Sequence, residues 1–315
     1  MQYEAAQLDQ PLQKHKPVTV ERAIQIFLAD KKGARADETT IAKFELTLSR
    51  LREFCDRQSL LFIREIKLEH LSTWRETWGS YYGSNFSLRN NQSRLRHFFR
   101  YCNNAGLVSD NPATKLSAIK ISDDDYEVDP YTQKEYLAIL KAISQCDNIG
   151  SVNRERVKAA MQLQRWSGLS LVDAVCLEKD ELVRDGKRYR VDTSRRKSGT
   201  RVNNVIPGWL GEELLRVKNG NQQYFFWSGR STPKSATSIY DKLYRKVFAK
   251  AGIANSGSHR FRHLFAVSLL EASVDIRIVS RALGHKSLAT TERYYAKWST
   301  KQQATLATAL TKTWS

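Results

Sequence analysis

One stretch near the C-terminus decides what kind of fold and site to expect: SHRFRHLFAVSLLEASVDIRIVSRALGHKSLATTERYY, residues 258–295. Its first part predicts a helix over 258–272. His259, Arg262 and His263 stand at i, i+3 and i+4, so such a helix carries all three on one face. The stretch therefore opens with two imidazoles and a guanidinium side by side.

The second part of the stretch adds two features at fixed distances. A helix over 275–283 ends at Leu283, and the glycine that follows is a common helix stop. His285 comes directly after that glycine and offers a further imidazole. Tyr294 stands nine residues after His285, with Tyr295 beside it. The chain thus presents His, Arg, His and Tyr in a set order.

A metal site is a poor match for the first of these faces. A helical zinc motif has Glu directly after its first His, whereas Arg260 follows His259 here. The neighbouring guanidiniums would also repel a metal cation. Guanidinium and imidazole groups suit an anion instead, and a phosphate most of all. We therefore expect an anion site without a metal.

Net charge indicates the partner. The 315 residues carry 51 Lys and Arg against 33 Asp and Glu, a formal charge of +18. The excess is spread along the chain: residues 1–122 hold 19 basic and 13 acidic side chains, and residues 123–315 hold 32 and 20. Such a chain usually binds a polyanion, most often nucleic acid, although charge for solubility alone is the alternative.

The sequence also indicates where the protein works. No apolar run is long enough to span a membrane, and the first residues lack the apolar core of a secretory signal. The four cysteines are widely spaced and are typical of reduced thiols inside a cell: Cys55, Cys102, Cys146 and Cys176. We expect a cytoplasmic protein associated with DNA and no membrane partner.

An acidic run marks the division of the chain. Residues 122–130, SDDDYEVDP, carry five acidic side chains that an anionic partner would repel, which favours an exposed linker. Asn111-Pro112 stops a helix shortly before it. The predicted parts are an N-terminal tail at 1–16, a helical body at 17–113, a linker at 114–130, a second body at 131–300 and a C-terminal tail helix at 301–315.

The first body is predicted to be all-helical. One long helix shows a buried face at every third or fourth residue, with Thr39 or Thr40 as its cap: Ile41, Phe44, Leu48, Leu51 and Phe54. A later helix begins near Ser87 and carries on its polar side the residue types that contact phosphates and base edges: Arg89, Asn90, Asn91, Gln92, Arg94, Arg96 and Arg100. A merely solvated helix face is the alternative.

The second body is predicted to be mixed and mostly helical. Between its helices, residues 181–207 alternate in polarity around turns at Asp185-Gly186 and Ser198-Gly199, which predicts two or three antiparallel strands. The expected helices cover 132–146, 151–168, 208–217, 235–251, 258–272 and 275–283.

The ordered residues of 258–295 resemble the tyrosine recombinase, or phage integrase, family of DNA strand-exchange enzymes. The family pattern is His-x-x-Arg, then Leu-Gly-His, then a nucleophilic Tyr nine positions on; it falls on His259, Arg262, His285 and Tyr294. Lys197, in a predicted hairpin turn, matches the Lys that the family has there. The resemblance covers roughly residues 17–300 and implies a mainly α fold: a helical, SAM-like core-binding domain and a catalytic domain with a small antiparallel sheet, clamped around duplex DNA.

The resemblance also implies the chemistry. Tyr294 attacks a phosphodiester, giving a 3′-phosphotyrosine and a free 5′-hydroxyl, and a second DNA strand then attacks that link. Because the covalent link conserves the energy of the ester, no metal, nucleotide or other cofactor is needed. Arg262 and the imidazoles of His259 and His285 would hold the charged transition state. Lys197 would protonate the leaving 5′-oxygen.

Some assignments keep an alternative. His263 is more typical of a packing residue than of a catalyst, and Tyr295 becomes the nucleophile if the register shifts by one. Lys197 follows two arginines, and any of the three could reach a phosphate. The DNA contacts predicted in this body are Arg195, Arg196 and Arg260.

One position departs from the family pattern. The family has Thr-Gly-Leu-Arg, whose Arg is a second guanidinium on the phosphate, whereas this chain has Ser170 in place of that Arg. Arg165, five residues earlier, points about 140° away around a helix axis. Because one transition-state donor is worth on the order of 10²–10³ in rate, we expect DNA binding to persist and strand cleavage to be slow or absent.

The resemblance implies an assembly as well. The tail has an apolar stripe at i, i+4 and i+8, Leu306, Leu310 and Trp314, which would dock on a neighbouring protomer of a tetramer on two DNA sites. Packing of the tail on its own domain is the alternative.

Two rival functions remain: an inert DNA-binding or architectural relative, and a type IB topoisomerase-like enzyme that acts without site preference. The recombinase interpretation, which we favour over these two, implies that the protein belongs to a mobile element.

Overall fold

The computed structural model describes residues 17–299 and residue 308. The chain divides into two compact units, Met1–Asp125 and Tyr126–Ser315, and each is described by itself. The division falls inside the segment 114–130 that the sequence predicts as a linker. The N-terminal tail and the apolar stripe of the C-terminal tail lie outside the described residues.

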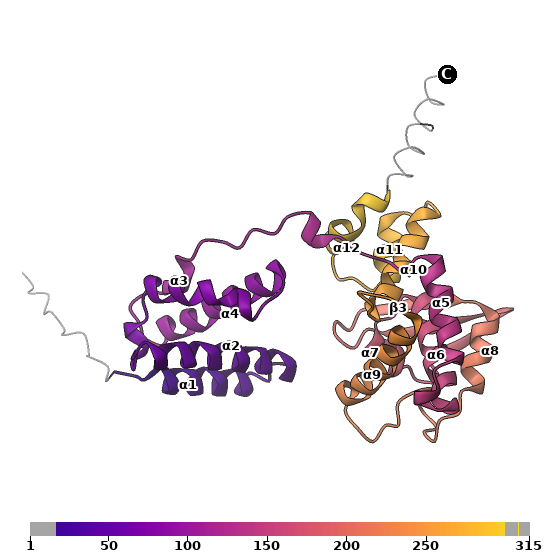
Figure 1. The fold of residues 1–315 in the computed structure, drawn as a ribbon, viewed down its shortest axis with the longest axis horizontal. Helices are drawn as coiled ribbons and strands as arrows, with labels where there is room; N and C mark the ends of the chain where they lie inside the picture. Colours follow the sequence, from indigo (N-terminus) through magenta and orange to yellow (C-terminus); the bar gives the residue numbers. More distant parts are fainter. Residues whose placement is uncertain (1–16, 300–307, 309–315) are drawn as a thin grey trace, which may run out of the picture. The chain divides into compact units, whose positions relative to one another are not determined.

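The first unit is helical, as predicted (Figure 1). Its helices are α1 (Val20–Gly33), α2 (Glu38–Arg57), α3 (Leu68–Glu76) and α4 (Asn85–Asn104), with short 3₁₀ turns η1 (Ile63–Glu65), η2 (Thr77–Ser80) and η3 (Pro112–Thr114) between them. A further turn, η4 (Asp124–Tyr126), lies at the division. The cap of α2 is Asp37 rather than Thr39 or Thr40, because its carboxylate accepts the N–H groups of both threonines.

The core of the first unit forms because the apolar stripes of these helices face one another. Phe44, Leu48, Leu51 and Phe54 of α2 are all buried, as the helical spacing predicts. Phe27 of α1 packs edge-on against aromatic rings of α2 and α4. The unit therefore fixes α4 with its apolar side inward.

The second unit is mixed and mostly helical (Figure 1). Its elements in chain order are α5 (Gln133–Ser144), η5 (Asp147–Ile149), α6 (Ser151–Ser167), α7 (Leu171–Val175), β1 (Leu182–Asp185), β2 (Arg188–Ser194), β3 (Arg201–Ile206), α8 (Gly208–Arg216), α9 (Pro233–Ala251), α10 (His259–Glu271), α11 (Ile276–Ala282), α12 (Leu288–Tyr295) and η6 (Ala296–Ser299). The six helices expected from the sequence are all present.

The predicted sheet is also present, with three antiparallel strands in the order β1-β2-β3. Gly186 takes the left-handed turn between β1 and β2, and Ser194 pairs with Arg201 at the end of β2 and β3. Residues 195–200 are the turn that joins these two strands. The turn carries Arg195, Arg196 and Lys197, so the hairpin delivers three predicted cations at one end of the sheet.

The packing of this unit brings distant segments to the same place. Helix α6 packs on α10 and on β3, and α11 also contacts β3. Gly168 ends α6 with φ +69°, and a side chain there would meet the ring of Phe265 on α10 at 2.4 Å. The ends of α6 and α11, the start of α10 and the β2–β3 turn consequently supply the predicted site.

Candidate active site

Arg262 is the best-fixed group of the site. It lies on α10 with 2% of its surface exposed. Its Nη1 donates to the carbonyl of Gly168 at 2.5 Å, and its Nη2 donates to the carbonyl of Leu283 at 2.5 Å. Burial lowers the pKa of Arg262 to about 10, so it stays charged at neutral pH. Two helix ends therefore hold one guanidinium in place.

Gly284 lets a second side chain come close to the same helix end. It follows the last residues of α11 with φ +62°. A side chain at this position would meet Cδ of Arg195 at 2.7 Å and Cγ2 of Val202 at 2.8 Å. The Leu-Gly-His sequence thus has a physical reason: only a glycine both closes α11 and leaves room for the hairpin.

Arg195 lies beside Arg262. Its side chain, 13% exposed, donates from Nε to Oδ2 of Asp173 at 3.2 Å and from Nη1 to the carbonyl of Leu283 at 3.1 Å. Arg262 donates to that same carbonyl oxygen. The sequence predicts Arg195 as a DNA contact of the hairpin, but the pairing of the two guanidiniums could not be foreseen.

Asp173 was missed by the sequence interpretation. It is 4% exposed, and its Oδ1 accepts the backbone N–H of Arg196 at 2.9 Å. Ser170 caps α7: its hydroxyl donates to Oδ2 of Asp173 at 2.6 Å and accepts the N–H of Asp173 at 3.4 Å. The signal in the sequence was the Ser-x-x-Asp spacing of a helix cap.

The imidazoles are neutral groups around these cations. Desolvation, followed by the charges of Arg262 and Arg195, lowers the pKa of both His259 and His285 to about 4. The charge of Lys197, on the exposed turn, is a further and smaller cause that lowers the pKa of His259. The ring of His259 lies edge-on to that of His263 at 4.8 Å, and His285 bonds through Nδ1 to the hydroxyl of Thr291 at 2.7 Å. The structure thus brings together the predicted His259, Arg262, His285 and Lys197.

The two tyrosines differ sharply. Tyr295 is 2% exposed, and its hydroxyl lies 2.8 Å from Nδ1 of His263. Burial raises the pKa of Tyr295 to about 12, and it lowers the pKa of His263 to about 3. Tyr294 is half-buried and rests edge-on against the ring of Tyr126 at 5.4 Å. No contact of the Tyr294 hydroxyl with Arg262 is seen in the described residues.

Arg165 lies away from this cluster, as the sequence predicts. Its Nη2 donates to the hydroxyl of Ser268 at 3.1 Å, and its guanidinium lies 4.6 Å from the centre of the Trp166 ring. It lines a separate cavity of about 570 Å³ together with residues 127–133. Arg165 therefore does not replace the charge that Ser170 lacks.

Arg260 corrects the sequence-based list of DNA contacts. The structure buries this residue instead, with its Nη2 3.1 Å from the carboxylate of Asp129 and 3.2 Å from that of Glu135. Its guanidinium also stacks over the ring of Tyr131 at 4.2 Å. Arg260 therefore ties the segment before α5 to α10, and it is not available to DNA.

The polar side of α4 needs a second correction. Asn91 has no exposed surface, because its Oδ1 accepts the hydroxyls of Thr47 and Tyr82. Gln92 is buried too, and Arg96 donates to the carbonyls of Ala113 and Leu116. Gln92 and Arg96 thus hold the chain that returns after α4, whereas Asn91 joins α4 to α2. The exposed or half-exposed cations that remain on this helix are Arg89, Arg94 and Arg100.

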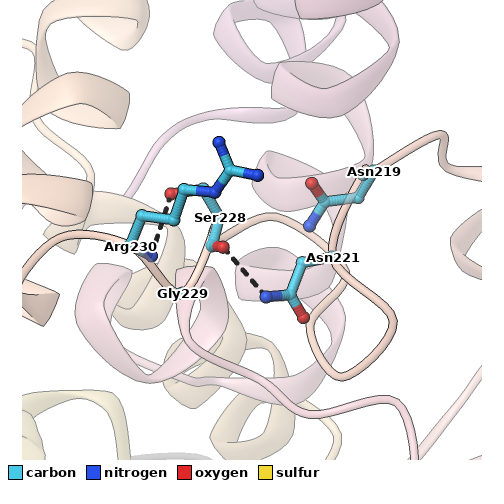
Figure 2. Close-up of a pocket in the computed structure, with 6 residues that line it drawn as sticks. Asn219, Asn221, Ser228, Gly229 and Arg230 are labelled. Carbon is cyan, nitrogen blue, oxygen red and sulfur yellow. Dashed lines mark hydrogen bonds between the residues drawn. The ribbon is translucent and has the colours of Figure 1, made fainter.

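A cavity of about 420 Å³ lies apart from these groups, between the two arms of the loop after α8 (Figure 2). Its polar side chains hold the loop itself: Asn221 donates to the carbonyl of Ser228 at 2.9 Å, and Asn219 donates to the carbonyls of Tyr224 and Trp227. The described lining holds no His, Cys, Asp, Glu or Lys that could act as a base beside the Ser228 hydroxyl.

Two further features were sought in the part of the chain that the structure describes: a metal-binding cluster and a membrane-spanning helix. Across residues 17–299 and 308, no group of His, Cys, Asp and Glu is placed to hold a metal ion. None of the helices in that part of the chain is long and apolar enough to cross a bilayer.

Comparison with known proteins agrees with the geometry. The model of the phage integrase family matches residues 131–301, more than half of the chain. The tyrosine recombinase XerC of Alcanivorax borkumensis is 31% identical over 215 residues, which are 64% of this chain and 66% of that relative. The chain therefore belongs to the phage integrase family of tyrosine recombinases.

Solved structures share the fold. A post-cleavage complex of the XerH site-specific recombinase bound to a palindromic difH substrate matches with a TM-score of 0.69 and 17% identity, over 90% of this chain and 84% of that one. A lambda integrase tetramer bound to a Holliday junction matches with a TM-score of 0.66 and 18% identity, over 91% of this chain and 83% of that one. At these identities the likeness concerns the fold.

Proposed function

We propose that this protein is a site-specific DNA recombinase that breaks and rejoins strands through a 3′-phosphotyrosine on Tyr294. The observation that carries the proposal is the fixed, charged Arg262 flanked by the neutral imidazoles of His259 and His285. We infer that these donors bind one anion together with Lys197, an exposed cation whose charge lowers the pKa of His259. That arrangement matches the demands of a phosphodiester under attack.

In the first step the Tyr294 hydroxyl gives its proton to a neutral imidazole of the site, and its oxygen forms a bond to phosphorus while the bond to the 5′-oxygen breaks. The departing 5′-oxygen takes a proton from the ammonium group of Lys197 on the exposed turn. In the second step a 5′-hydroxyl of the partner strand gives its proton back to Lys197 and attacks the phosphotyrosine, and the released phenol takes its proton back from the imidazole. Arg262 donates to the oxygens whose charge grows in both transition states, and the imidazoles add neutral donors.

Tyr294 is the better nucleophile of the pair. Tyr295 would have to leave the core and give up its bond to His263, and burial opposes its ionisation. In the part of the chain that the structure describes, Tyr294 makes ring contacts with Tyr126 and Tyr295 and has part of its surface in solvent. Tyr294 must move to reach a phosphate held by Arg262. The freer residue can make that movement at smaller cost in packing.

The DNA is held by both units. The first unit offers the arginines of α4, next to a surface cavity of about 320 Å³ that Arg89 and Asn90 line. The second offers Arg196 and Lys197 on the exposed turn.

We propose that four protomers act on two sites, by analogy with the lambda integrase tetramer, and that the tail at 301–315 links neighbours. The protein would work in the cytoplasm on DNA of a mobile element.

Ser170 supplies no charge to the phosphate. Its hydroxyl is engaged as the cap of α7 and as a donor to Asp173. A site with two phosphate-binding arginines would therefore cleave faster than this one, unless another side chain supplies the charge that Ser170 lacks.

The decisive experiment is covalent trapping. The protein first selects its preferred duplexes from a random-sequence library, and these are then synthesised with a nick beside the candidate cleavage point. A covalent adduct on the selected sites supports the proposal. Tight binding without any adduct identifies the inert DNA-binding relative instead. Relaxation of supercoiled plasmid without site preference would point to a topoisomerase.

A further inference from the structure

Two guanidiniums share one acceptor in the core of the site. Nη2 of Arg262 and Nη1 of Arg195 both donate to the carbonyl oxygen of Leu283, at 2.5 and 3.1 Å. Two donors on one oxygen lie within a few ångström of each other, and like charges at that distance repel. After burial, the charge of Arg195 is the next cause that lowers the pKa of Arg262. Perturbed groups of this kind cluster at functional sites, and two close guanidiniums suit an anion.

One carboxylate does not neutralise the pair. Asp173 contacts Arg195 but also accepts the Ser170 hydroxyl and the Arg196 N–H, so its charge is shared. The imidazoles are neutral and add no charge. With Lys197 nearby, the site holds three cations against one carboxylate, which suits a phosphodiester and the more negative transition state that follows it.

We propose that Arg195 is a catalytic residue, the second guanidinium on the reacting phosphate, in place of the one that Ser170 lacks. The inference rests on the proposed function. Its two bonds to protein occupy two of the five N–H donors of an arginine, and the rest of the fork is left for a phosphate. The charge thus comes from the β2–β3 turn, not from the start of α7.

The serine itself favours this arrangement. Ser170 and Arg195 bind the same oxygen of Asp173, so a short, neutral side chain at position 170 leaves Asp173 free to anchor the hairpin arginine. A guanidinium at 170 would compete with Arg195 for that carboxylate. The side chain of Arg195 also packs closely against Gly284, which further restricts its conformation. Ser170, Asp173 and Arg195 consequently form one unit.

The neighbouring cations fit the role less well. Arg196 turns toward the other side of the hairpin, where its Nη2 donates to the carbonyl of Cys176 and its guanidinium lies 5.8 Å from the Trp227 ring centre. Arg165 bonds to Ser268. Among the described hydrogen bonds, neither Arg196 nor Arg165 donates to the carbonyl of Leu283, the end of α11 that holds Arg262.

The test is single-turnover adduct formation on the selected, nicked duplexes. Arg195→Ala is expected to slow the step by about 10²–10³-fold, whereas DNA affinity falls by roughly tenfold or less, as for one phosphate contact among many. Arg190→Ala is the matched control, because Arg190 is also a hairpin arginine held by a carboxylate, that of Asp185 at 2.7 Å. The control should cleave at the native rate.

A rescue separates catalysis from support of the hairpin. Ser170→Arg should change the native rate little, yet it should restore about tenfold or more to Arg195→Ala, since either position then supplies the missing donor. A merely structural Arg195 would not be rescued, because an arginine at 170 does not rebuild the bond from the turn to Leu283. Thermal melting of each variant shows whether it is folded.

The outcomes are distinct. Native-rate cleavage by a folded Arg195→Ala overturns the inference and leaves the proposed function standing. A gain of about 10²-fold or more from Ser170→Arg alone also overturns it, because the second donor was then absent. If Arg195→Ala does not fold, Arg195→Lys decides: it keeps the charge but loses the fork, so a native rate contradicts the inference. Absence of any adduct with the native protein overturns the proposed function itself.

Discussion

Ser170 and Arg195 meet on a single atom, Oδ2 of Asp173, at 2.6 and 3.2 Å. The first bond caps a short helix, and the second anchors a hairpin. The position at which the family carries a phosphate-binding arginine therefore serves here as a structural link between α7 and the β2–β3 turn. The relationship explains how a serine can stand there without leaving a buried carboxylate unpaired.

The cap can be tested through stability. Ser170→Ala removes the hydroxyl that accepts the Asp173 N–H, and loss of such a cap costs about 0.5–2 kcal/mol. We expect a lower denaturant midpoint for the second unit with an unchanged slope. Ser170→Asn, which can still cap a helix, should lose less. Equal stability of Ser170→Ala and the native protein would show that the cap contributes nothing.

The choice of nucleophile gives a second prediction. Tyr294→Phe should abolish the covalent adduct and leave DNA binding nearly unchanged, because only a hydroxyl is lost. Tyr295→Phe should keep the adduct but destabilise the fold by about 1 kcal/mol, through its buried bond to His263. Gel shift of the adduct and thermal melting measure the two effects. An adduct that survives only in Tyr294→Phe would place the nucleophile at Tyr295.

Stability should depend on pH because of three histidines of the second unit. The folded protein lowers the pKa of His263 to about 3 and the pKa of both His259 and His285 to about 4, each from an ordinary value near 6.5. Between these values the unfolded chain binds more protons than the folded one, so stability is complete above about pH 6.5 and falls as the pH drops toward 4. Denaturant unfolding at several pH values measures the slope. His263→Asn should flatten it, and an unaltered slope in that variant would contradict the assignment.

Salt dependence of DNA binding tests the α4 surface. Arg89→Ala removes an exposed cation and should reduce the slope of log K against log salt by about 0.9 if it contacts one phosphate. Lys43→Ala, a change at an exposed lysine of α2, serves as a comparison for the loss of charge alone. The same slope in Arg89→Ala and in the native protein would remove this face from the DNA interface.

Arg260 should behave in the opposite way. Because it is buried against the carboxylates of Asp129 and Glu135, Arg260→Ala should lower the free energy of unfolding by about 1–3 kcal/mol. The salt slope of DNA binding should stay at its native value, since no phosphate contact is lost. A stable variant with a reduced slope would return Arg260 to the list of DNA contacts.

The local pattern of the chain was enough to predict most of the secondary structure. Apolar spacing located the helices of both units, and two turn signals located the hairpin, because these features depend on neighbours within a few residues. The order of His259, Arg262, His285 and Tyr294 likewise resembles the pattern of the family, and the match of the family model to residues 131–301 confirmed that resemblance. The cap of α2 was missed by two or three residues, since Asp37, Thr39 and Thr40 are all residue types that cap helices well.

Tertiary structure decided which polar groups meet. Arg195 reaches a carboxylate 22 residues away and a carbonyl 88 residues away, and Arg260 reaches Asp129 across 131 residues of chain. Asn91 turns inward because Thr47, from another helix, offers it a partner. Periodicity gives the face of a helix but not what packs against that face. Arg260, which the sequence pattern places on the surface, is therefore buried in ion pairs with Asp129 and Glu135. On our proposal, Arg195 supplies the charge that Ser170 lacks, and only folding brings the turn that carries Arg195 to the site.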